Sequence, residues 1–238
     1  MTILPGIIAL IASYVIGSIP FGLLIVKLKS GKDIRSVESG RTGGTNAFRA
    51  AGILAGAATT LLDGAKAFCA VWIARYLTPG NYWIEIFAPL CAIVGHNYSI
   101  FLIERNEKGR IRLRGGAGGA SCAGGAIGLW PPVILIILPI ALLIIYFIGY
   151  ASVTTMSIAL IVTITFIYRA IIGASPWQYV LYGIIAEALL IWALRPNIKR
   201  LIQGNERQVG NRAHKKSKHQ SSSSSSSSPD FSSKSSSK

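Results

Sequence analysis

The stretch from Gly31 to Gly52 carries the residue types that bind phosphate groups in proteins. Ser39, Arg41 and Arg49 flank the tetrapeptide Gly43–Asn46, so short hydroxyls and guanidinium groups lie beside glycines that expose backbone N–H groups. All of these groups donate hydrogen bonds to an anion. A helix is expected to follow, and its N-terminus would add a favourable dipole. The pattern predicts an anion site here, and a flexible polar linker is the simpler alternative.

A second stretch, RLRGGAGGASCAGGAIGLW at 112–130, places arginines directly before a segment almost without side chains. Arg110, Arg112 and Arg114 alternate with Ile111 and Leu113, and six of the eleven residues 115–125 are glycine. Two interpretations stand side by side: an anion site at a membrane surface, or the close packing of a small-residue helix. The stretch lacks the GK[ST] ending of a nucleotide-binding loop, which argues against an ATPase.

Three further clusters place polar groups inside or beside apolar runs, where such groups are costly. His96, in VGHNYSIFL, is the only histidine outside the C-terminal tail; it could be a general base, a substrate donor or a packing hydrogen bond. Asp63 and Lys66, in LLDGAKAF, are three apart on one helix face and can pair. Ser152, in YASVTTM, belongs to a hydroxyl run that either serves a site or caps a helix.

Composition indicates an integral membrane protein. The 238 residues are 51% hydrophobic and only 14% charged, whereas soluble domains carry about 25% charged residues. Of 24 Lys and Arg residues, 21 fall in three blocks (27–49, 104–114 and 195–238) that are separated by long apolar runs. A nucleic-acid binder can be equally basic, but half of its chain would not lie in apolar segments of membrane length. We therefore expect a membrane partner and no nucleic acid.

The apolar runs predict an all-α fold with seven transmembrane helices. The fourth is expected to be short and glycine-rich, and the candidate spans are 3–26, 51–76, 85–103, 116–131, 133–149, 153–169 and 178–194. Basic loops favour the cytoplasm, so the N-terminus is predicted outside and the C-terminus inside. If 116–131 were re-entrant, six spans would remain and the N-terminus would lie inside, or one later span would be wrongly assigned.

The chain divides into two parts by composition. Residues 1–207 are expected to form one polytopic membrane domain. Residues 208–238 are basic and serine-rich, and such a segment cannot bury enough apolar surface to fold. We predict that it is a disordered cytoplasmic tail.

In their order, these clusters resemble the bacterial acyl-phosphate:glycerol-3-phosphate acyltransferase family of the PlsY type. The matches cover residues 3 to about 207 and run in sequence: GSIPFG (17–22), DIRSVESGRTGGTNAFRAAG (33–52), LLDGAKAF (61–68), GHNYSIFL (95–102), GGAGGA (115–120), YASVTTM (150–156) and LRPNIKRLIQGNE (194–206). Seven collinear matches are far more specific than any single glycine motif.

The resemblance implies an enzyme of phospholipid synthesis in the bacterial plasma (inner) membrane, with its active site facing the cytoplasm. The family transfers an acyl group from acyl phosphate to the sn-1 hydroxyl of glycerol 3-phosphate, which gives lysophosphatidic acid and phosphate. It uses no metal and no cofactor. An acyl-carrier-protein:phosphate acyltransferase supplies the acyl phosphate, so a functional link to that enzyme is implied.

The resemblance also assigns site residues by position. Together with the clusters above, it places four residues in the catalytic group: Ser39, Arg49, Ser152 and His96. The residues expected to bind substrate or phosphate are Arg41, Gly43, Gly44, Thr45, Asn46, Arg114, Gly115, Gly116, Gly118 and Asn197.

The sequence departs from the family pattern at specific positions. Ala117 stands where the family's GGKG motif has a phosphate-binding lysine, and Leu194 stands where many members have a histidine. Glu38 and Arg41 replace a glycine and an asparagine in the first loop. Arg41 and Arg114 are therefore candidates to supply the missing cation, although arginine and lysine are not interchangeable.

Two other functions remain open at this stage. The first is an altered-substrate or inactive membrane paralogue of the family, which the loss of the lysine at Ala117 favours. The second is a small transporter, which would be expected to show two hydropathically similar halves. The sequence shows no convincing internal repeat, and its charges concentrate in loops on one side.

Overall fold

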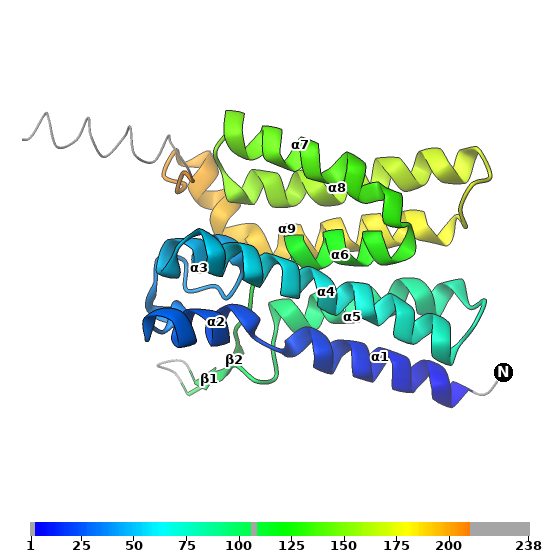
Figure 1. Cartoon of the computed structure of the whole chain (residues 1–238), viewed down its shortest axis with the longest axis horizontal. Helices are drawn as coiled ribbons and strands as arrows, with labels where there is room; N and C mark the ends of the chain where they lie inside the picture. Colours follow the sequence, from blue (N-terminus) through cyan, green and yellow to red (C-terminus); the bar gives the residue numbers. More distant parts are fainter. Residues whose placement is uncertain (1–2, 106–108, 210–238) are drawn as a thin grey trace, which may run out of the picture.

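The computed structural model describes residues 3–105 and 109–209, and these residues are mostly helical. The helices run side by side along the long axis of the molecule (Figure 1). Their bounds are α1 Ile3–Ser18, α2 Phe21–Ser30, α3 Gly44–Ala51, α4 Ile53–Leu77, α5 Tyr82–Asn97, α6 Gly119–Leu129, α7 Ile134–Phe147, α8 Ala151–Ile171 and α9 Gln178–Ile202, with short 3-10 turns at Ile34–Ser36 and Pro131–Val133.

The first predicted span, 3–26, is two helices with a break between them. Pro20 is the N-cap of α2. A proline has no N–H to donate to the i−4 carbonyl, and its ring disfavours the helical conformation in the residue before it. Taken together, Ile3–Ser30 is one of four helical segments, among the residues that the structure describes, that are long and apolar enough to cross a membrane. The others are α4, α8 and α9.

Small residues let the central helices approach closely. α4 packs against α6 and α1 against α5. A Cβ atom at Gly124 of α6 would overlap the backbone of Gly64 in α4, and one at Gly17 of α1 would overlap the backbone of Ala92 in α5. The small-residue interpretation of the glycine-rich stretch is therefore correct for α6, which has 11 residues.

A two-stranded antiparallel hairpin departs from the predicted all-α fold. β1 (Ile103–Arg105) pairs with β2 (Ile111–Leu113) in the register Ile103–Leu113, Glu104–Arg112 and Arg105–Ile111. The alternation of arginine with Ile111 and Leu113 has the period of two that is typical of a strand. The third predicted span, 85–103, accordingly ends early, because α5 stops at Asn97.

Four separate segments meet at one end of the bundle, the left side of Figure 1. They are the loop and helix α3 that follow α2, the hairpin, the start of α8 and the residues after α9. Gln208 pairs with Tyr150, and the Val209 N–H donates to the Gly149 carbonyl at 2.8 Å. Residues 208 and 209 are thus bonded to the segment before α8, and the rest of the predicted tail, from 210 on, lies outside the described residues.

Candidate active site at one end of the bundle

The segment Gly115–Gly118 packs tightly against the C-terminal end of α5. The Gly116 N–H donates to the His96 carbonyl at 2.9 Å. A Cβ at Gly115 would overlap that carbonyl, and a Cβ at Gly116 would overlap the His96 Nε2 atom. Gly118 has a φ of 90°, a conformation that favours glycine. We refer to residues 115–118 as the glycine turn.

Loop 31–43 is bonded directly to this glycine turn. The Thr42 N–H donates to the Gly115 carbonyl at 3.3 Å. The Arg41 guanidinium donates to the Gly116 carbonyl at 3.4 Å and to the Ala193 carbonyl near the end of α9. Arg41 therefore joins the glycine turn to α9, and in the turn it bonds to the residue that precedes Ala117. Burial, and secondly the charge of Arg200, lower the pKa of this guanidinium from its ordinary value.

Arg49 connects α3 to the start of α8. Its guanidinium donates to the Gln208 carbonyl at 3.4 Å, and the Gln208 side chain donates to the Tyr150 hydroxyl at 3.3 Å. Burial lowers the pKa of Arg49, and the carboxylate of Glu38 opposes that shift. The predicted residues Arg49 and Ser152 thus belong to segments that are joined through Gln208 and Tyr150.

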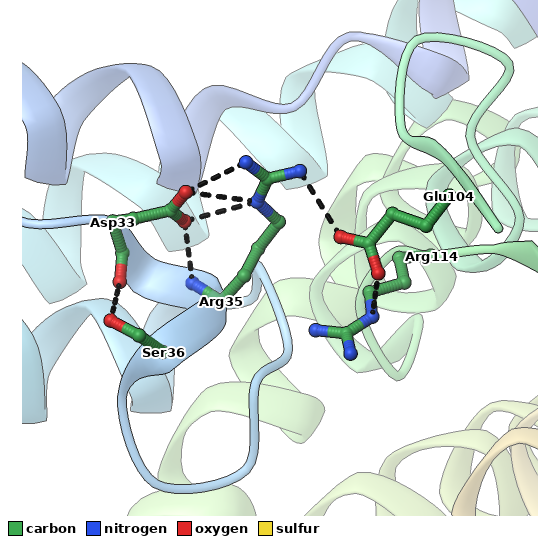
Figure 2. Close-up of polar contacts among 5 residues, drawn as sticks. All are labelled: Asp33, Arg35, Ser36, Glu104 and Arg114. Atoms are coloured by element: carbon green, nitrogen blue, oxygen red, sulfur yellow. Dashed lines mark hydrogen bonds and ion pairs between the residues drawn. The ribbon is translucent and has the colours of Figure 1, made fainter. Parts of the chain in front are cut away.

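Arg114 is held by a carboxylate from the hairpin. Its Nε atom lies 2.7 Å from Glu104 Oε2, and the other Glu104 oxygen lies 3.1 Å from Arg35. Arg35 also pairs with Asp33 at 2.7 Å. Figure 2 shows Glu104 between the two guanidinium groups, with the terminal nitrogens of Arg114 pointing away from it. The hairpin therefore fixes both loop 31–43 and the entry to the glycine turn.

Several buried polar atoms at this end of the bundle have no hydrogen-bond partner within the described chain. Both side-chain polar atoms of Asn97 are unpartnered, although this residue is only 5% exposed and adjoins Gly118. The Ser152 hydroxyl is likewise unpartnered, and so is the Asn197 carbonyl oxygen, whose amide donates to Glu206 at 2.9 Å. Buried polar groups are rarely left without partners. A polar ligand bound at this end of the bundle would supply the missing hydrogen-bond partners.

Some predicted binding residues build the loop in this structure. The Asn46 amide donates to the carbonyls of Ile34, Val37 and Arg41, at 3.1, 3.0 and 2.8 Å. A Cβ at Gly44 would overlap the Thr60 hydroxyl, so Gly44 brings α3 close to α4. The Asn46 amide nitrogen therefore shapes the loop, whereas its buried carbonyl oxygen has no partner within the described chain.

The other predicted residues of loop 31–43 and α3 are more open. Thr45 is exposed, and Gly43 has open space where a side chain would be. The Ser39 hydroxyl accepts the Arg41 N–H at 3.4 Å. No side chain caps the start of α3 at Gly43, so the N-terminal N–H groups of this helix remain suited to an anion.

The predicted pairing of Asp63 with Lys66 is confirmed at 2.8 Å. Sequence reasoning missed Asn97 as a site residue and did not foresee Glu104 as the partner of Arg114. For Asn97, the available signal was its position directly after His96, at the end of an apolar helix. Among the described residues, no group of three or more His, Cys, Asp or Glu side chains is placed to hold a metal ion.

Comparison with known proteins agrees with this geometry. The sequence model of a family described as glycerol-3-phosphate acyltransferase matches residues 7–204. A glycerol-3-phosphate acyltransferase from Rubrobacter xylanophilus is 35% identical, over 87% of this chain and 96% of the relative. Glycerol-3-phosphate acyltransferase 2 from Moorella thermoacetica is 36% identical, over 87% and 99%.

Two solved structures share the fold. Both are crystal structures of PlsY, an integral membrane glycerol 3-phosphate acyltransferase. Its glycerol 3-phosphate form has a TM-score of 0.73 and 32% identity, and it covers 86% of this chain and 96% of its own. Its lysophosphatidic acid form has a TM-score of 0.71 and 30% identity, over 86% and 95%. The predicted acyltransferase class is confirmed, and this chain is a mostly helical integral membrane protein that belongs to the glycerol-3-phosphate acyltransferase family.

Proposed function

We propose that this chain transfers an acyl group from acyl phosphate to the sn-1 hydroxyl of glycerol 3-phosphate, with lysophosphatidic acid and phosphate as products. The observation that carries the proposal is the bonding of loop 31–43 to the glycine turn, which brings Arg41 against Gly116. This arrangement gathers cations and backbone N–H groups at one end of apolar helices. Two phosphate-bearing substrates and one acyl chain require such a place.

The reaction needs positioning more than activation, because an acyl phosphate already has a good leaving group. The acceptor hydroxyl oxygen bonds to the acyl carbonyl carbon, and the bond from that carbon to the phosphate oxygen breaks. The released phosphate takes the proton of the hydroxyl group. Fixed donors near the two phosphates would hold the reactants together and stabilise the charge on the leaving group. No metal or cofactor enters this scheme.

The proposal gives each site residue a role. Ser39, Arg49 and Ser152 contact substrate phosphate or the reacting groups, and His96 lies against Gly116. The binding group retains Arg41, Gly43, Thr45, Arg114, Gly115, Gly116, Gly118 and Asn197, while Gly44 and Asn46 hold the loop that presents it. The unpartnered Ser152 hydroxyl and the unpartnered atoms of Asn97 support this arrangement.

We also propose the topology that this chemistry requires. Seven spans with the N-terminus outside would put loop 31–43, the hairpin and the residues after α9 on the cytoplasmic side of a bacterial plasma membrane. There they would meet glycerol 3-phosphate and the acyl phosphate that an acyl-carrier-protein:phosphate acyltransferase supplies. Residues 208–238 would then extend into the cytoplasm. Cysteine labelling from each side of the membrane at Lys32 and Gly80 tests this arrangement.

The test of activity uses the purified full-length chain in lipid nanodiscs. Radiolabelled glycerol 3-phosphate is supplied with acyl phosphate, acyl-CoA or acyl carrier protein thioester, and lysophosphatidic acid is measured. We expect product with acyl phosphate alone and a loss of at least about 100-fold in Arg49→Ala, since hydrogen bonds to charged groups contribute about 1.5–3 kcal/mol each. Product no greater than in Arg49→Ala would contradict the proposal.

A second candidate function is transfer to a different phosphorylated polyol, and Ala117 favours it. The family's lysine is missing there, and the nearest cation is Arg41, whose guanidinium donates to the neighbouring Gly116 carbonyl. If Arg41 compensates, Arg41→Asn should lose activity and Ala117→Lys should restore it in the double variant. Activity of Arg41→Asn equal to the parent would show that the cation is not needed, and a screen of polyol phosphates would then decide the acceptor.

A further inference from the structure

A buried cluster of three titratable side chains lies directly under the glycine turn. Lys66 and Asp63 come from α4, and His96 comes from the last turn of α5. Lys66 Nζ lies 2.8 Å from Asp63 Oδ1 and 3.2 Å from His96 Nδ1. All three residues are at most 5% exposed. A charged pair in such a place is costly unless each donor finds an acceptor.

Each of the three ammonium protons of Lys66 has an acceptor within reach. An ammonium group has three donors and no acceptor. Lys66 has three acceptors within reach: Asp63 Oδ1, His96 Nδ1 and the Ile19 carbonyl at 2.9 Å. Since Lys66 can only donate, a hydrogen bond between the two requires His96 Nδ1 to accept. A neutral imidazole that accepts at Nδ1 carries its proton on Nε2.

The competing arrangement is a histidine with a proton on Nδ1, neutral or charged, that donates to Asp63. The His96 Nδ1–Asp63 Oδ1 separation is 3.4 Å, whereas Lys66 lies 0.6 Å closer to the same oxygen and 0.2 Å closer to His96 Nδ1, so the ammonium group is the better-placed donor to both atoms. A second cation would also face Lys66 across 3.2 Å in a buried site. Asp63 as carboxylate, Lys66 as ammonium and His96 as neutral imidazole leave the cluster with no net charge.

The other ring nitrogen of His96 faces the glycine turn. Its Nε2 atom lies so close to Gly116 that a Cβ there would overlap it. Arg41 donates to the carbonyl of the same Gly116. With its proton on Nε2, His96 therefore directs an N–H group, and not a lone pair, toward the glycine turn that Arg41 contacts.

We infer that His96 is a hydrogen-bond donor to a substrate phosphate and not a general base, and that Asp63 and Lys66 are positioning residues that fix its tautomer. The inference rests on the proposed function for the identity of the ligand. Of the alternatives that the sequence left open for His96, it favours the substrate donor, because a nitrogen that already carries a proton cannot accept one from the hydroxyl. The proton of the acceptor substrate then goes to the released phosphate.

The activity test compares two substitutions at the same position. Glutamine keeps an N–H donor near the place of Nε2 but cannot act as a base, whereas leucine supplies neither. We expect His96→Gln to keep kcat/KM within about 5-fold of the parent and His96→Leu to lose about 10- to 100-fold, the range for a hydrogen bond to a charged group. The KM that rises in His96→Leu identifies the phosphate concerned, that of glycerol 3-phosphate or that of acyl phosphate. His96→Gln as inactive as His96→Leu, or His96→Leu as active as the parent, would overturn the inference.

A spectroscopic test needs no substrate and so separates this inference from the proposed activity. Nitrogen NMR of the full chain with ¹⁵N-histidine, assigned through His96→Gln, reports which ring nitrogen of His96 is protonated. At neutral pH we expect a proton on Nε2 alone, and in Lys66→Met we expect this preference to be lost. A proton on Nδ1, protons on both nitrogens, or an unchanged spectrum in Lys66→Met would overturn the assignment, whatever the activity assay shows.

Discussion

The two ends of the helix bundle each hold a cluster centred on half-buried arginines, but only one of the clusters has all of its polar groups paired. At the end away from loop 31–43, Arg75 donates to the carbonyls of Gly128 and Leu129 at 3.0 and 3.1 Å and to the Tyr179 hydroxyl at 3.2 Å. Tyr179 donates in turn to Glu85 at 2.6 Å, and Arg75 lies 3.4 Å from the same carboxylate. These bonds join the ends of α4, α5, α6 and α9.

At the end that holds the glycine turn, by contrast, several polar groups are left unmatched. The Asn97 amide and the Ser152 hydroxyl have no partner within the described chain, and the Arg114 terminal nitrogens point away from Glu104. A cluster that serves folding alone satisfies its own groups, because each orphaned buried polar atom costs about 1–3 kcal/mol. These two clusters therefore differ in hydrogen-bond completeness and not in the presence of charge, although single unpartnered buried atoms also occur elsewhere, at Thr59, Arg169 and Glu187.

The largest loss of activity is expected from a substitution that adds a side chain inside the glycine turn. In Gly116→Ala the new methyl group would overlap His96 Nε2 and force the turn away from α5. We expect at least about a 100-fold loss of kcat/KM in the lysophosphatidic acid assay, because small misplacements of binding groups have effects of this size. Gly6→Ala is the matched control, since its methyl meets only the flexible tip of Ile84. Equal activity in the two variants would show that the turn is not part of the site.

The next largest effect is expected on stability, from a substitution that breaks the complete cluster around Arg75. Arg75→Met leaves Glu85, which is 4% exposed, without its cation, and this should lower the free energy of unfolding by on the order of 3 kcal/mol. Activity per folded molecule should change less than about 2-fold, because the cluster lies at the other end of the helices. Thermal unfolding in nanodiscs and the activity assay measure the two quantities. Arg195→Met is the control, since the Arg195 guanidinium contacts the carbonyl and the ring of Trp192 in its own turn and is not paired with a buried carboxylate among the described residues. An activity loss in Arg75→Met without a stability loss would reverse the assignment of the two ends.

Sequence reasoning reached the helical membrane fold because apolar runs and segregated arginines are properties of composition. It also placed Arg41, Arg49, Gly115, Gly116 and Ser152 in candidate stretches. It could not tell which polar groups the fold would satisfy, since that depends on contacts between distant segments. Asn46 shows the difference: its predicted role was binding, yet its amide is used by three carbonyls of loop 31–43.

Local geometry was the other limit of prediction. The helical break before α2 follows from Pro20 and was readable in the sequence, but the long apolar run concealed it. The strand at Ile111–Leu113 was visible as an alternation of arginine and apolar residues, yet a strand of three residues has no signal strong enough to predict its partner. Glu104 therefore could not be identified as the group that holds both Arg35 and Arg114.

A smaller effect is expected at Asn97, where one substitution should raise stability and lower activity. Asn97→Leu replaces a buried amide without partners by an apolar side chain of similar size, so the protein should become slightly more stable, by about 1 kcal/mol. Activity should fall about 10-fold if the amide contacts substrate. The change in melting temperature and kcat/KM for glycerol 3-phosphate test this pair of effects. A loss of stability would show instead that Asn97 belongs to the structural frame, as Arg75 does.

The smallest effect concerns the outer edge of the site, where Asp33 pairs with Arg35. The side-chain hydrogen bond from Arg35 holds the pKa of Asp33 below its ordinary value of 3.8, against the opposing effect of burial. A carboxyl whose pKa is lower in the folded state adds stability above its unfolded pKa, and this stability is lost as the pH falls through the folded pKa. The Asp33 side chain is 42% exposed, so the effect belongs with surface pairs of about 0–1 kcal/mol. The parent should therefore melt slightly above Asp33→Asn at neutral pH, and the gap should close below about pH 4. A gap that widens as the pH falls would mean that the pair with Arg35 does not form, and Glu104 alone would then hold the hairpin to loop 31–43.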